Sequence, residues 1–498
     1  MNVNPITRLD YPDPDVIRVE DTYYMVSTTM HFMPGCEILQ SFDLVHWEHV
    51  TYVYETLDHT DAQQLKSGQN IYGQGMWAAS LRYHEGRFCI CFVANDTRKT
   101  YLYTSEKIDG PWKKQLIEGF YHDGSLLFDE DGRNYIVYGN DEIWITELNE
   151  DLTAPKKGGL HRLLVSDHKN PELGYEGSHI QKINGYYYIF LVHSLRDRWM
   201  RTEACFYSDS LEGEFTGGDV LCDDRGYCGQ GVAQGGIVDT PDGKWYAMLF
   251  QDSGAVGRIP ILLPVTWKDH FPFFGQNGHV PEEIEVHSTR PGYIYQPLVG
   301  SDDFCNGLLP RWQFNHDPDP RYYHLDALQG TYTITTREVC TELTQAVNTL
   351  TQRMSYPSCA AEVTVDASAL KEGDVAGLCA LQSCYAAVGI TKHHGKYEVL
   401  MLDKKEDGIL DMTEGTVVES HQMDFRLEAD FCNMKDEARC YYRVNKGDWL
   451  PIGNVHKLYF KLDHFTGCRF GLFCYAAEET GGSACFRDFK YYDVDEIS

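Results

Sequence analysis

Positive charge is scarce in this sequence of 498 residues, where 43 Lys and Arg stand against 74 Asp and Glu. The net charge of −31 repels phosphate backbones and anionic lipid surfaces, so neither nucleic acid nor a membrane is an expected partner. The sequence also lacks a run of 18 apolar residues and a basic start followed by an apolar stretch. These absences predict a cytoplasmic protein, or one expressed without its signal.

The pattern CxxC is missing, although the sequence contains 16 cysteines. A structural zinc site is therefore not expected. The cysteines are irregularly spaced, and several lie inside strand-like runs, such as Cys89 and Cys91 in RFCICFVAND and Cys474 in GLFCYAA. This placement favours buried free thiols in a reducing compartment over disulfides.

The abundant residues are those of strands and turns. Aromatic residues make up 13% of the sequence, with 33 Tyr, and there are 44 Gly. Such a composition is typical of β proteins. A chain of this length is too long for one ordinary core, so we expect two large β domains or three smaller ones.

The first half of the chain contains an internal repeat. Each of five segments combines a short apolar strand, a tight turn and a strand rich in aromatic and β-branched residues. The segments are DPDVIRVEDTYYMVSTT, WAASLRYHEGRFCICFVAND, DGSLLFDEDGRNYIVYGND, EGSHIQKINGYYYIFLVHS and QGGIVDTPDGKWYAMLFQD. Their turns begin at Asp21, Glu85, Asp131, Asn184 and Asp242, and four of them continue with Gly, whereas the first continues with Thr22.

The turn starts are separated by 64, 46, 53 and 58 residues. Each interval is long enough for a four-stranded antiparallel sheet with its loops, which is one blade of a propeller. We therefore predict a five-bladed β-propeller over residues 1–298.

One position is shared by all five repeats. Counting back eight residues from each turn start reaches Asp13, Trp77, Asp123, Glu176 and Gln234. The first strand of each propeller blade lines the central channel, so residues at a common register form a ring at one end of it. We expect these five side chains to surround the mouth of the channel, with Trp77 as a platform on which a sugar stacks and Gln234 as a group that hydrogen-bonds to it.

Carboxylates from different blades can face each other across a gap of the size of a sugar. Glycoside hydrolysis needs such a pair, one protonated to assist the leaving oxygen and one ionised to activate water or attack carbon. A third carboxylate can raise the acid's pKa and orient it. Alone, Asp13 before Pro14 has the plainer interpretation of a turn former, and Asp123 and Glu176 that of loop ligands for amides. The shared offset favours the catalytic interpretation.

The blade segments resemble glycoside hydrolase family 43. The resemblance is carried by NPITRLDYPDPDVIRVEDTYYMVSTT, IYGQGMWAASLRYHEGRF, FYHDGSLLFDEDGRNYIVYG, GYEGSHIQKINGYYYIF and AQGGIVDTPDGKWYAMLFQDSGAVGRIP. Towards the C-terminus, DDFCNGLLPRWQFNHDPDPRYYHLDALQG, AVNTLTQRM and CRFGLFCYA resemble the appended β-sandwich of that family's β-xylosidase branch.

The resemblance implies a role for each acid. Asp13 in YPDPD corresponds to the general base, Asp123 in YHDGS to a residue that tunes pKa and orients, and Glu176 in YEGS to the general acid of a one-step inverting reaction. It also implies that Arg258 in GAVGRIP reaches the terminal sugar, with Trp77 packed beside it. A strand-end salt bridge is the alternative for Arg258.

Three departures from the family bear on substrate and metal. Asp15 stands where Ser is frequent, and MHFMPG, which includes Met30 and Phe32, replaces a segment that helps to shape the sugar pocket. Ala233 stands where many members have a His that helps to hold a calcium or water cluster. No cofactor is expected to be required, and a Ca²⁺ ion in the channel remains an open alternative.

The repeat stops near residue 300, where short alternating strands begin. GTYTITT, CAAEVTVDAS, GDVAGLCALQ, YAAVGITKH, KYEVLMLD, FRLEADF, ARCYYRVN, KLYFKLD and CRFGLFCYA predict a jelly-roll, concanavalin-like β-sandwich over residues 299–498. The preceding WKDHFPFFGQNGHVPEEIEVHSTRPGYIYQP is predicted as a linker. The resemblance implies that a loop of this domain closes the pocket; a stabilising or carbohydrate-binding module is the alternative.

Three functions follow as hypotheses. The first is an inverting exo-hydrolase that removes terminal β-1,4-linked xylose from small oligosaccharides, with its two acting carboxyls about 6.5–9.5 Å apart. The second is an α-L-arabinofuranosidase acting on arabinoxylan or arabinan side chains. The third is a propeller that binds glycans without catalysis. The acidic surface and the sandwich are compatible with a homo-oligomer.

Overall fold

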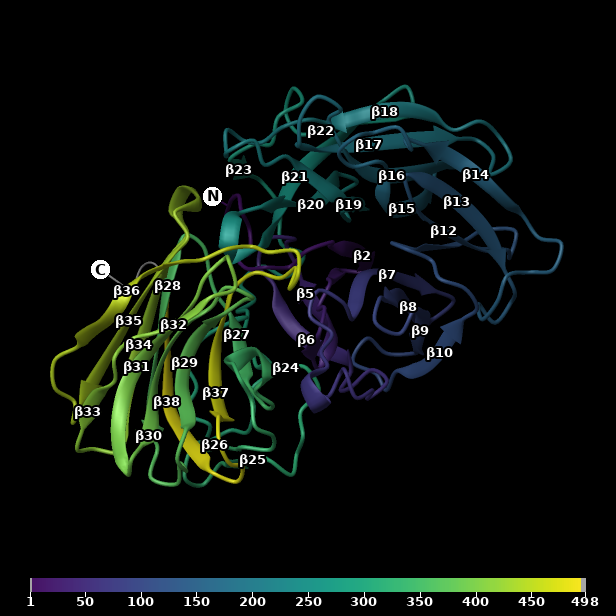
Figure 1. Cartoon of the computed structure of the whole chain (residues 1–498). Helices are drawn as coiled ribbons and strands as arrows, with labels where there is room; N and C mark the ends of the chain where they lie inside the picture. The colour runs from purple at the N-terminus through teal and green to yellow at the C-terminus, as the bar shows by residue number, and fades with distance from the viewer. Residues whose placement is uncertain (1, 494–498) are drawn as a thin grey trace.

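The computed structural model describes residues 2–493, which form a structure built almost wholly from β-strands (Figure 1). A propeller, coloured purple to teal, lies beside a sandwich, coloured green to yellow. Helical structure in the described part is limited to short 3-10 turns, namely η1 (Lys66–Gly68), η2 (Gly254–Val256), η3 (Leu343–Gln345) and η4 (Cys432–Met434). Within residues 2–493 we find no helix long and apolar enough to cross a membrane.

Each propeller blade is a four-stranded antiparallel sheet. Blade one contains β2 (Asp15–Val19), β3 (Thr22–Val26), β5 (Gly35–Ser41) and β6 (Glu48–Tyr54). Blade two contains β7 (Met76–His84), β8 (Arg87–Ala94), β9 (Lys99–Ser105) and β10 (Lys113–Ile117). Blade three contains β11 (Ser125–Phe128), β12 (Asn134–Asn140), β13 (Glu142–Leu148) and β14 (His161–Ser166). Blade four contains β15 (Glu176–Ile183), β16 (Tyr186–Ser194), β17 (Arg201–Ser208) and β18 (Thr216–Leu221). Blade five contains β19 (Val232–Asp239), β20 (Trp245–Asp252), β21 (Arg258–Lys268) and β22 (Phe271–Phe274).

The first strands of the five blades contact one another in a closed ring: β2, β7, β11, β15 and β19. Apolar side chains pack between neighbouring blades, such as Ile38 and Leu81 between blades one and two and Phe190 and Leu249 between blades four and five. Each buried side chain of this size contributes roughly 1.5–3 kcal/mol of transfer free energy. The predicted five-bladed propeller, with first strands around the channel, is confirmed.

The hairpin turns begin where predicted in blades two and four. In blades three and five the turns are longer and begin two residues earlier, at Asp129 and Thr240. Glu85–Gly86 and Asn184–Gly185 are two-residue turns in which both φ angles are positive, as a type I′ turn requires. In blade one, Val19 pairs with Thr22, so the turn lies at Glu20–Asp21, one residue earlier than predicted. Thr22 belongs to the second strand and not to the turn, so its position does not need Gly.

The C-terminal domain is a sandwich of two antiparallel sheets around one large apolar core. One sheet contains β24 (Gln313–Asn315), β27 (Leu350–Arg353), β29 (Asp374–Leu381), β30 (Ala386–His393), β31 (Lys396–Lys404), β32 (Leu410–Met412), β33 (Thr416–Val418) and β37 (Arg469–Ala476). The other contains β25 (Tyr323–Asp326), β26 (Thr331–Thr335), β28 (Ser358–Asp366), β34 (Gln422–Asp430), β35 (Glu437–Val444), β36 (Leu450–Lys457) and β38 (Ser483–Asp493). The predicted sandwich is confirmed.

A short strand from the propeller extends the first of these sheets. β4 (Phe32–Met33) pairs with β24, so the segment before blade one's third strand is bonded to the sandwich. The guanidinium of Arg469 lies 3.4 Å from the centre of the Phe32 ring, which is 2% exposed. The two domains are therefore joined by a shared sheet, which a boundary read along the sequence could not reveal.

The predicted linker is partly structured. Its residues Phe271–Phe274 form β22, the outer strand of blade five, and β23 (Glu283–Ile284) pairs with β1 (Asn2–Val3). The alternation of aromatic residues with Pro and Gly concealed these strands. The division at residue 298 stays a prediction.

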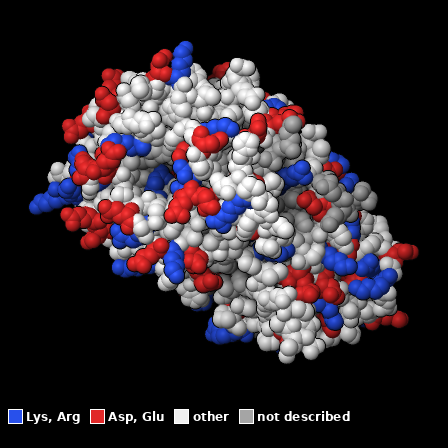
Figure 2. Space-filling model, turned by 180° about the vertical axis from the view of Figure 1, so that it is seen from behind, with Lys and Arg blue, Asp and Glu red and all other residues white. Residues whose placement is uncertain are grey.

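Cysteines and charges are distributed as the composition suggests. Most of the cysteines are buried, and none forms a disulfide within residues 2–493. Acidic side chains are scattered over the face seen in Figure 2, with Lys and Arg between them. No broad basic patch covers this face.

Candidate active site

Five residues at the mouth of the channel have positive φ angles: Asp13 (52°), Ala78 (21°), Asp123 (47°), Gly177 (66°) and Gln234 (65°). Side chains rarely adopt this conformation, and such residues concentrate at functional sites. In blades one, three and five the left-handed residue is the one at the predicted shared position. In blade two the left-handed residue is Ala78, which follows Trp77, and in blade four it is Gly177, which follows Glu176. The predicted ring is therefore staggered by one residue between alternate blades.

Asp13 is a buried carboxylate with a partner for each oxygen. The Thr28 hydroxyl donates to Oδ2 at 2.5 Å, and Arg258 Nη1 donates to Oδ1 at 3.1 Å. Thr28 in turn accepts a hydrogen bond from the Ala78 amide at 2.8 Å, which ties the first two blades together. A hydroxyl therefore binds one carboxylate oxygen of Asp13, and a guanidinium binds the other. Arg258 thus forms a salt bridge, as its alternative interpretation expected, and the partner is the candidate base itself.

Glu176 and Asp123 lie on either side of His122. His122 Nε2 is 3.5 Å from Asp123 Oδ2 and 3.5 Å from Glu176 Oε2. The negative charge of Asp123, more than any other cause, raises the pKa of His122 to about 9. Burial raises the pKa of Asp123 to about 6, and the carboxylates of Glu176 and Asp13 add to the shift. At neutral pH the site therefore holds a cationic imidazole between two carboxyl groups.

Two further bonds fix these carboxyls. The Asn140 amide donates to Glu176 Oε2 at 2.7 Å, and the Gly177 backbone N–H donates to Asp123 Oδ2 at 3.0 Å. A side chain at Gly177 would collide with Gln234, whose Cγ lies 2.7 Å from the position of a Cβ. Gly is needed there because of both the positive φ and this close approach. Asp123 is thereby bonded to the residue that follows the candidate acid.

A loop of the sandwich closes over the propeller at this point. The guanidinium of Arg258 lies 4.5 Å from the Phe465 ring centre and 5.9 Å from that of Phe460. The rings of Phe465 and Trp77 are 5.4 Å apart. This loop includes most of KLYFKLD, which was predicted as a strand, but only Lys457 belongs to β36. The prediction was wrong because Phe460 and its neighbours alternate like a strand while packing on the other domain.

Trp77 and Arg258 both contact Phe465, and both have unsatisfied donors. Their packing beside a bound sugar stays a prediction. Trp77 Nε1 and Arg258 Nε are buried without a hydrogen-bond partner in the described part of the chain. Buried donors of this kind are costly unless something else accepts from them. A sugar hydroxyl is a suitable acceptor.

Arg201 was missed by the sequence analysis. This buried side chain donates from Nε to Asp252 Oδ2 at 2.9 Å, while Nη1 and Nη2 form no hydrogen bond within residues 2–493. Its guanidinium lies 5.2 Å from the Phe250 ring, which Arg258 also covers at 5.4 Å. Trp199 is 44% exposed and lies 5.3 Å from the same guanidinium. Only its neighbour Trp199, an aromatic residue in a polar loop, could have indicated this position.

The remaining predicted binding residues are buried. Gln234 is 4% exposed, and its backbone N–H donates to the buried Glu203 Oε2 at 2.7 Å, while its side chain lies against Gly177. Its contact with a sugar stays a prediction. Met30 is fully buried, and its backbone pairs with Met76, next to Trp77. Phe32 lies in the strand shared with the sandwich, covered by Arg469, so its prediction as a sugar contact is wrong.

The channel beneath the acids is crossed by an arginine. Arg82 Nη1 donates to Asp15 Oδ2 at 2.8 Å, and Nη2 donates to Ser125 Oγ at 2.7 Å and to the Ile180 carbonyl at 3.2 Å. Asp15 Oδ1 lies 3.2 Å from His179 Nδ1.

The remaining cavity is about 10 Å³, room for roughly one water. Ca²⁺ needs six to eight oxygen ligands. Both carboxylate oxygens of Asp15 are already bound, one to Arg82 and one to His179, so Asp15 does not fit the ion.

Calcium is therefore expected to have no effect on stability. Adding EDTA or millimolar Ca²⁺ should leave the Tm of the full chain unchanged, whereas an ion present at 100 times its Kd would add about 2.7 kcal/mol. Differential scanning fluorimetry checks this, with Mg²⁺ as the control ion. A Tm that falls in EDTA and recovers with Ca²⁺ would contradict the role assigned to Arg82.

A pair of carboxyl groups suits the cleavage of a glycosidic bond. The aromatic rings above them can stack on a sugar, and the charged side chains can bind its hydroxyl groups. The propeller and this site together define a glycoside hydrolase. Comparison with known proteins gives the family. The model described as "Glycosyl hydrolases family 43" matches residues 3–272, and "Beta xylosidase C-terminal Concanavalin A-like domain" matches residues 301–492. The chain belongs to glycosyl hydrolase family 43, so the hypothesis of a propeller that binds glycans without catalysis is wrong.

One solved structure and two named proteins that are similar to this chain support its membership of the family. A structure named "Bifunctional GH43-CE" from Bacteroides eggerthii is 42% identical with a TM-score of 0.93; the match covers 100% of this chain but 64% of that one. A "Beta-xylosidase" of Formosa agariphila is 26% identical over 99% of this chain and 89% of its own length. A "Non-reducing end alpha-L-arabinofuranosidase" of Bacteroides ovatus is 24% identical over 82% of this chain and 79% of its own.

Proposed function

We propose that the protein is an inverting exo-hydrolase that releases terminal pentose, with β-1,4-linked xylose of short oligosaccharides as its main substrate. The observation that carries the exo assignment is the closure of the site by Phe460 and Phe465 of the sandwich over Arg258. A wall from a second domain leaves room for a chain end and obstructs a chain that continues past it. The relative named β-xylosidase matches both domains, which supports xylose.

The reaction needs one base and one acid. Asp13, held by Arg258 and Thr28, takes a proton from a water beneath C1, and the water oxygen forms the new bond to that carbon. Glu176 gives its proton to the glycosidic oxygen as the C1–O bond breaks, so the leaving sugar departs neutral. Asp123 and His122 hold Glu176 in place and set the charge around it.

A terminal α-L-arabinofuranosyl unit is the second candidate substrate. The relative named α-L-arabinofuranosidase covers most of this chain, including parts of both domains, which favours keeping this sugar. Both pentoses can place a C1 between the same two carboxyls.

A panel of aryl pentosides together with xylobiose, xylotetraose and arabinoxylan oligomers tests the proposal. An exo-xylosidase should release xylose alone from xylotetraose, and the intermediate oligomers should appear in order of decreasing length. Release of xylobiose as the first product would contradict the exo assignment. Activity confined to the arabinofuranoside would transfer the assignment to the second substrate, and hydrolysis of neither pentoside would refute the proposal.

The cation at His122 should control the alkaline limb of the pH profile. Removing a cation beside a carboxyl favours the protonated form of that carboxyl, and removing an anion does the opposite. The alkaline limb of kcat/KM is therefore expected to move up by about one pH unit in His122→Asn. His287→Asn, at an exposed histidine, is the control. An alkaline limb that stays in place or moves down in His122→Asn would contradict the arrangement.

Arg201 should contribute to sugar binding. A charged hydrogen bond contributes about 1.5–3 kcal/mol, so Arg201→Met is expected to raise KM roughly 10- to 100-fold with a smaller change in kcat. Arg198→Met, in the loop that leads into β17 and with a 60% exposed side chain, is the matched control. Initial-rate kinetics on the best aryl pentoside distinguish the two. An unchanged KM in Arg201→Met would show that Arg201 acts only on folding through Asp252.

The free thiols support a reducing compartment. The cytoplasmic location and the homo-oligomer stay predictions.

A further inference from the structure

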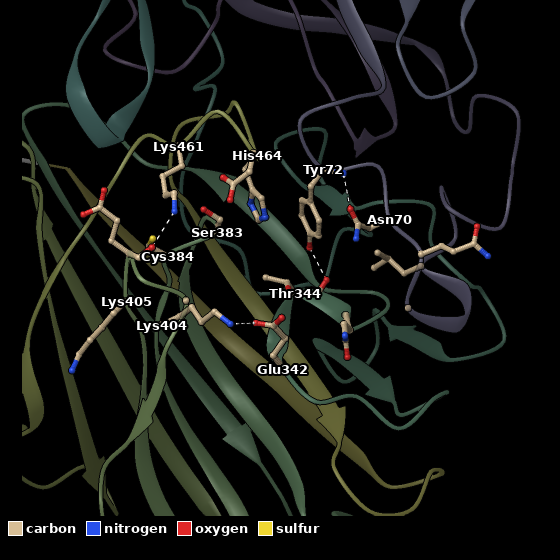
Figure 3. A pocket seen from close by; sticks show the side chains of 17 residues that line it. Asn70, Tyr72, Glu342, Thr344, Ser383, Cys384, Lys404, Lys405, Lys461 and His464 are labelled. Carbon is tan, nitrogen blue, oxygen red and sulfur yellow. Dashed lines mark hydrogen bonds and ion pairs between the residues drawn. The ribbon is translucent and has the colours of Figure 1, made fainter.

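A second pocket, of about 330 Å³, lies between the two domains (Figure 3). Its walls come from the propeller segment around Tyr72 and from sandwich segments around Glu342, Ser383, Lys404 and Lys461. The volume falls at the lower end of the range for small-molecule sites. The pocket is thus large enough for one or two sugar rings and is separate from the carboxylate ring.

The charges lining this pocket cancel. Three lysines, Lys404, Lys405 and Lys461, stand against three acids, Glu342, Glu406 and Asp463. Lys404 is paired with Glu342 at 2.9 Å, and Lys405 is paired with Asp411 outside the pocket. Lys461 donates to the Glu406 carbonyl at 3.3 Å. Because the charges are balanced and partly paired, the pocket suits a neutral ligand better than an ion.

One polar group in the pocket is left without a partner. The Ser383 hydroxyl is buried and forms no hydrogen bond within the described residues. A buried hydroxyl without a partner destabilises the folded chain, and structures usually satisfy such groups with a ligand or water. A ligand hydroxyl is one group that could pair with Ser383.

One wall of the pocket is a stacked pair of rings from both domains. The rings of Tyr72 and His464 are parallel at 3.8 Å, and the Tyr72 hydroxyl donates to the Thr344 carbonyl at 2.7 Å. Burial lowers the pKa of His464 to about 3, so this imidazole is neutral. Figure 3 shows His464 and Tyr72 side by side at the top of the pocket.

The same loop reaches both pockets. Asp463 and His464 line the interdomain pocket, and the next residue, Phe465, contacts Arg258 and Trp77 in the active site. Arg258 Nη2 also donates to the Phe465 carbonyl at 3.5 Å. A ligand held against His464 would therefore restrict the loop that positions Phe465.

We propose that this interdomain pocket is a second binding site for a neutral mono- or disaccharide, and that its occupancy holds the Phe465 loop over the active site. Among neutral molecules rich in hydroxyl groups, saccharides are those that the hydrolase encounters and releases. The ligand class rests on the family's hydrolase activity and is independent of which pentose is cleaved.

Calorimetric titration of the full-length Glu176→Gln variant counts the bound sugars without turnover. D-xylose, L-arabinose, D-glucose and xylobiose are the probes, and at least one is expected to occupy two sites. Adding Ser383→Phe, which fills the pocket, should leave one site, and Ser383→Ala should weaken the second site by about fivefold. Ser368→Phe, at an exposed serine of the same domain, should keep both sites.

Hydrogen exchange tests the coupling. The probe that occupies two sites should slow amide exchange in residues 458–466 of Glu176→Gln, and this protection should shrink when Ser383→Phe is added. A single site for every probe, a second site that survives Ser383→Phe, or displacement of the sugar by inorganic phosphate would overturn the proposal. If no pentoside is hydrolysed, the proposed substrate fails, but the number of bound sugars is still measured.

Discussion

Glu176→Gln should lose about 10³-fold in kcat/KM on xylobiose, because the leaving sugar then departs without a proton. An aryl pentoside with a dinitrophenolate leaving group needs little protonation, so its loss should stay below about tenfold. The amide of Gln can keep the contact with Asn140, which donates to Glu176 Oε2 at 2.7 Å, so the site should remain folded. Steady-state kinetics on the two substrates check this contrast.

Glu172→Gln is the matched control, because Glu172 is exposed and precedes Glu176 by only four residues. It should retain the activity of the unmodified chain on both substrates. Equal losses for Glu176→Gln on the good and poor leaving groups would contradict the role of general acid.

Asp13→Asn should lose about 10³-fold on both substrates, since water must be deprotonated whatever group departs. The change preserves the size of the side chain that receives bonds from Thr28 and Arg258. Its effect should therefore appear in kcat, with the Tm little changed. The same two substrates and a thermal melt provide the measurement.

Asp21→Asn, at an exposed aspartate in the first hairpin, serves as its control. A loss that depended on the leaving group would assign proton donation to Asp13 and would reverse the two roles. Substantial activity in both Asp13→Asn and Glu176→Gln would refute the catalytic pair.

The sequence predicted the ring of acids because the repeat carries two regular signals. Period-two alternation sets the face of each first strand, and the hairpin turn fixes its register. The structure adds a stagger, because Asp13 has a positive φ itself whereas Glu176 precedes the left-handed Gly177. Such a bulge depends on how neighbouring blades pack, and no residue type in the repeat marks it.

The contacts that complete the site could not be predicted in the same way. His122 and Asn140 act through space on Glu176 from another blade. Phe465 arrives from the other domain, in a loop whose apolar alternation indicated a strand. Phe32 was assigned to the sugar pocket by resemblance, and its strand pairing with the sandwich appears only in the fold.

The stereochemistry of the first product tests the central claim most directly. Proton NMR during the first turnovers of the full chain on an aryl β-xyloside resolves the two anomers of xylose before they equilibrate. A single displacement by water, with Asp13 as base and Glu176 as acid, predicts that α-xylose appears first and β-xylose follows by mutarotation. Initial formation of β-xylose would require a covalent intermediate and would contradict the account.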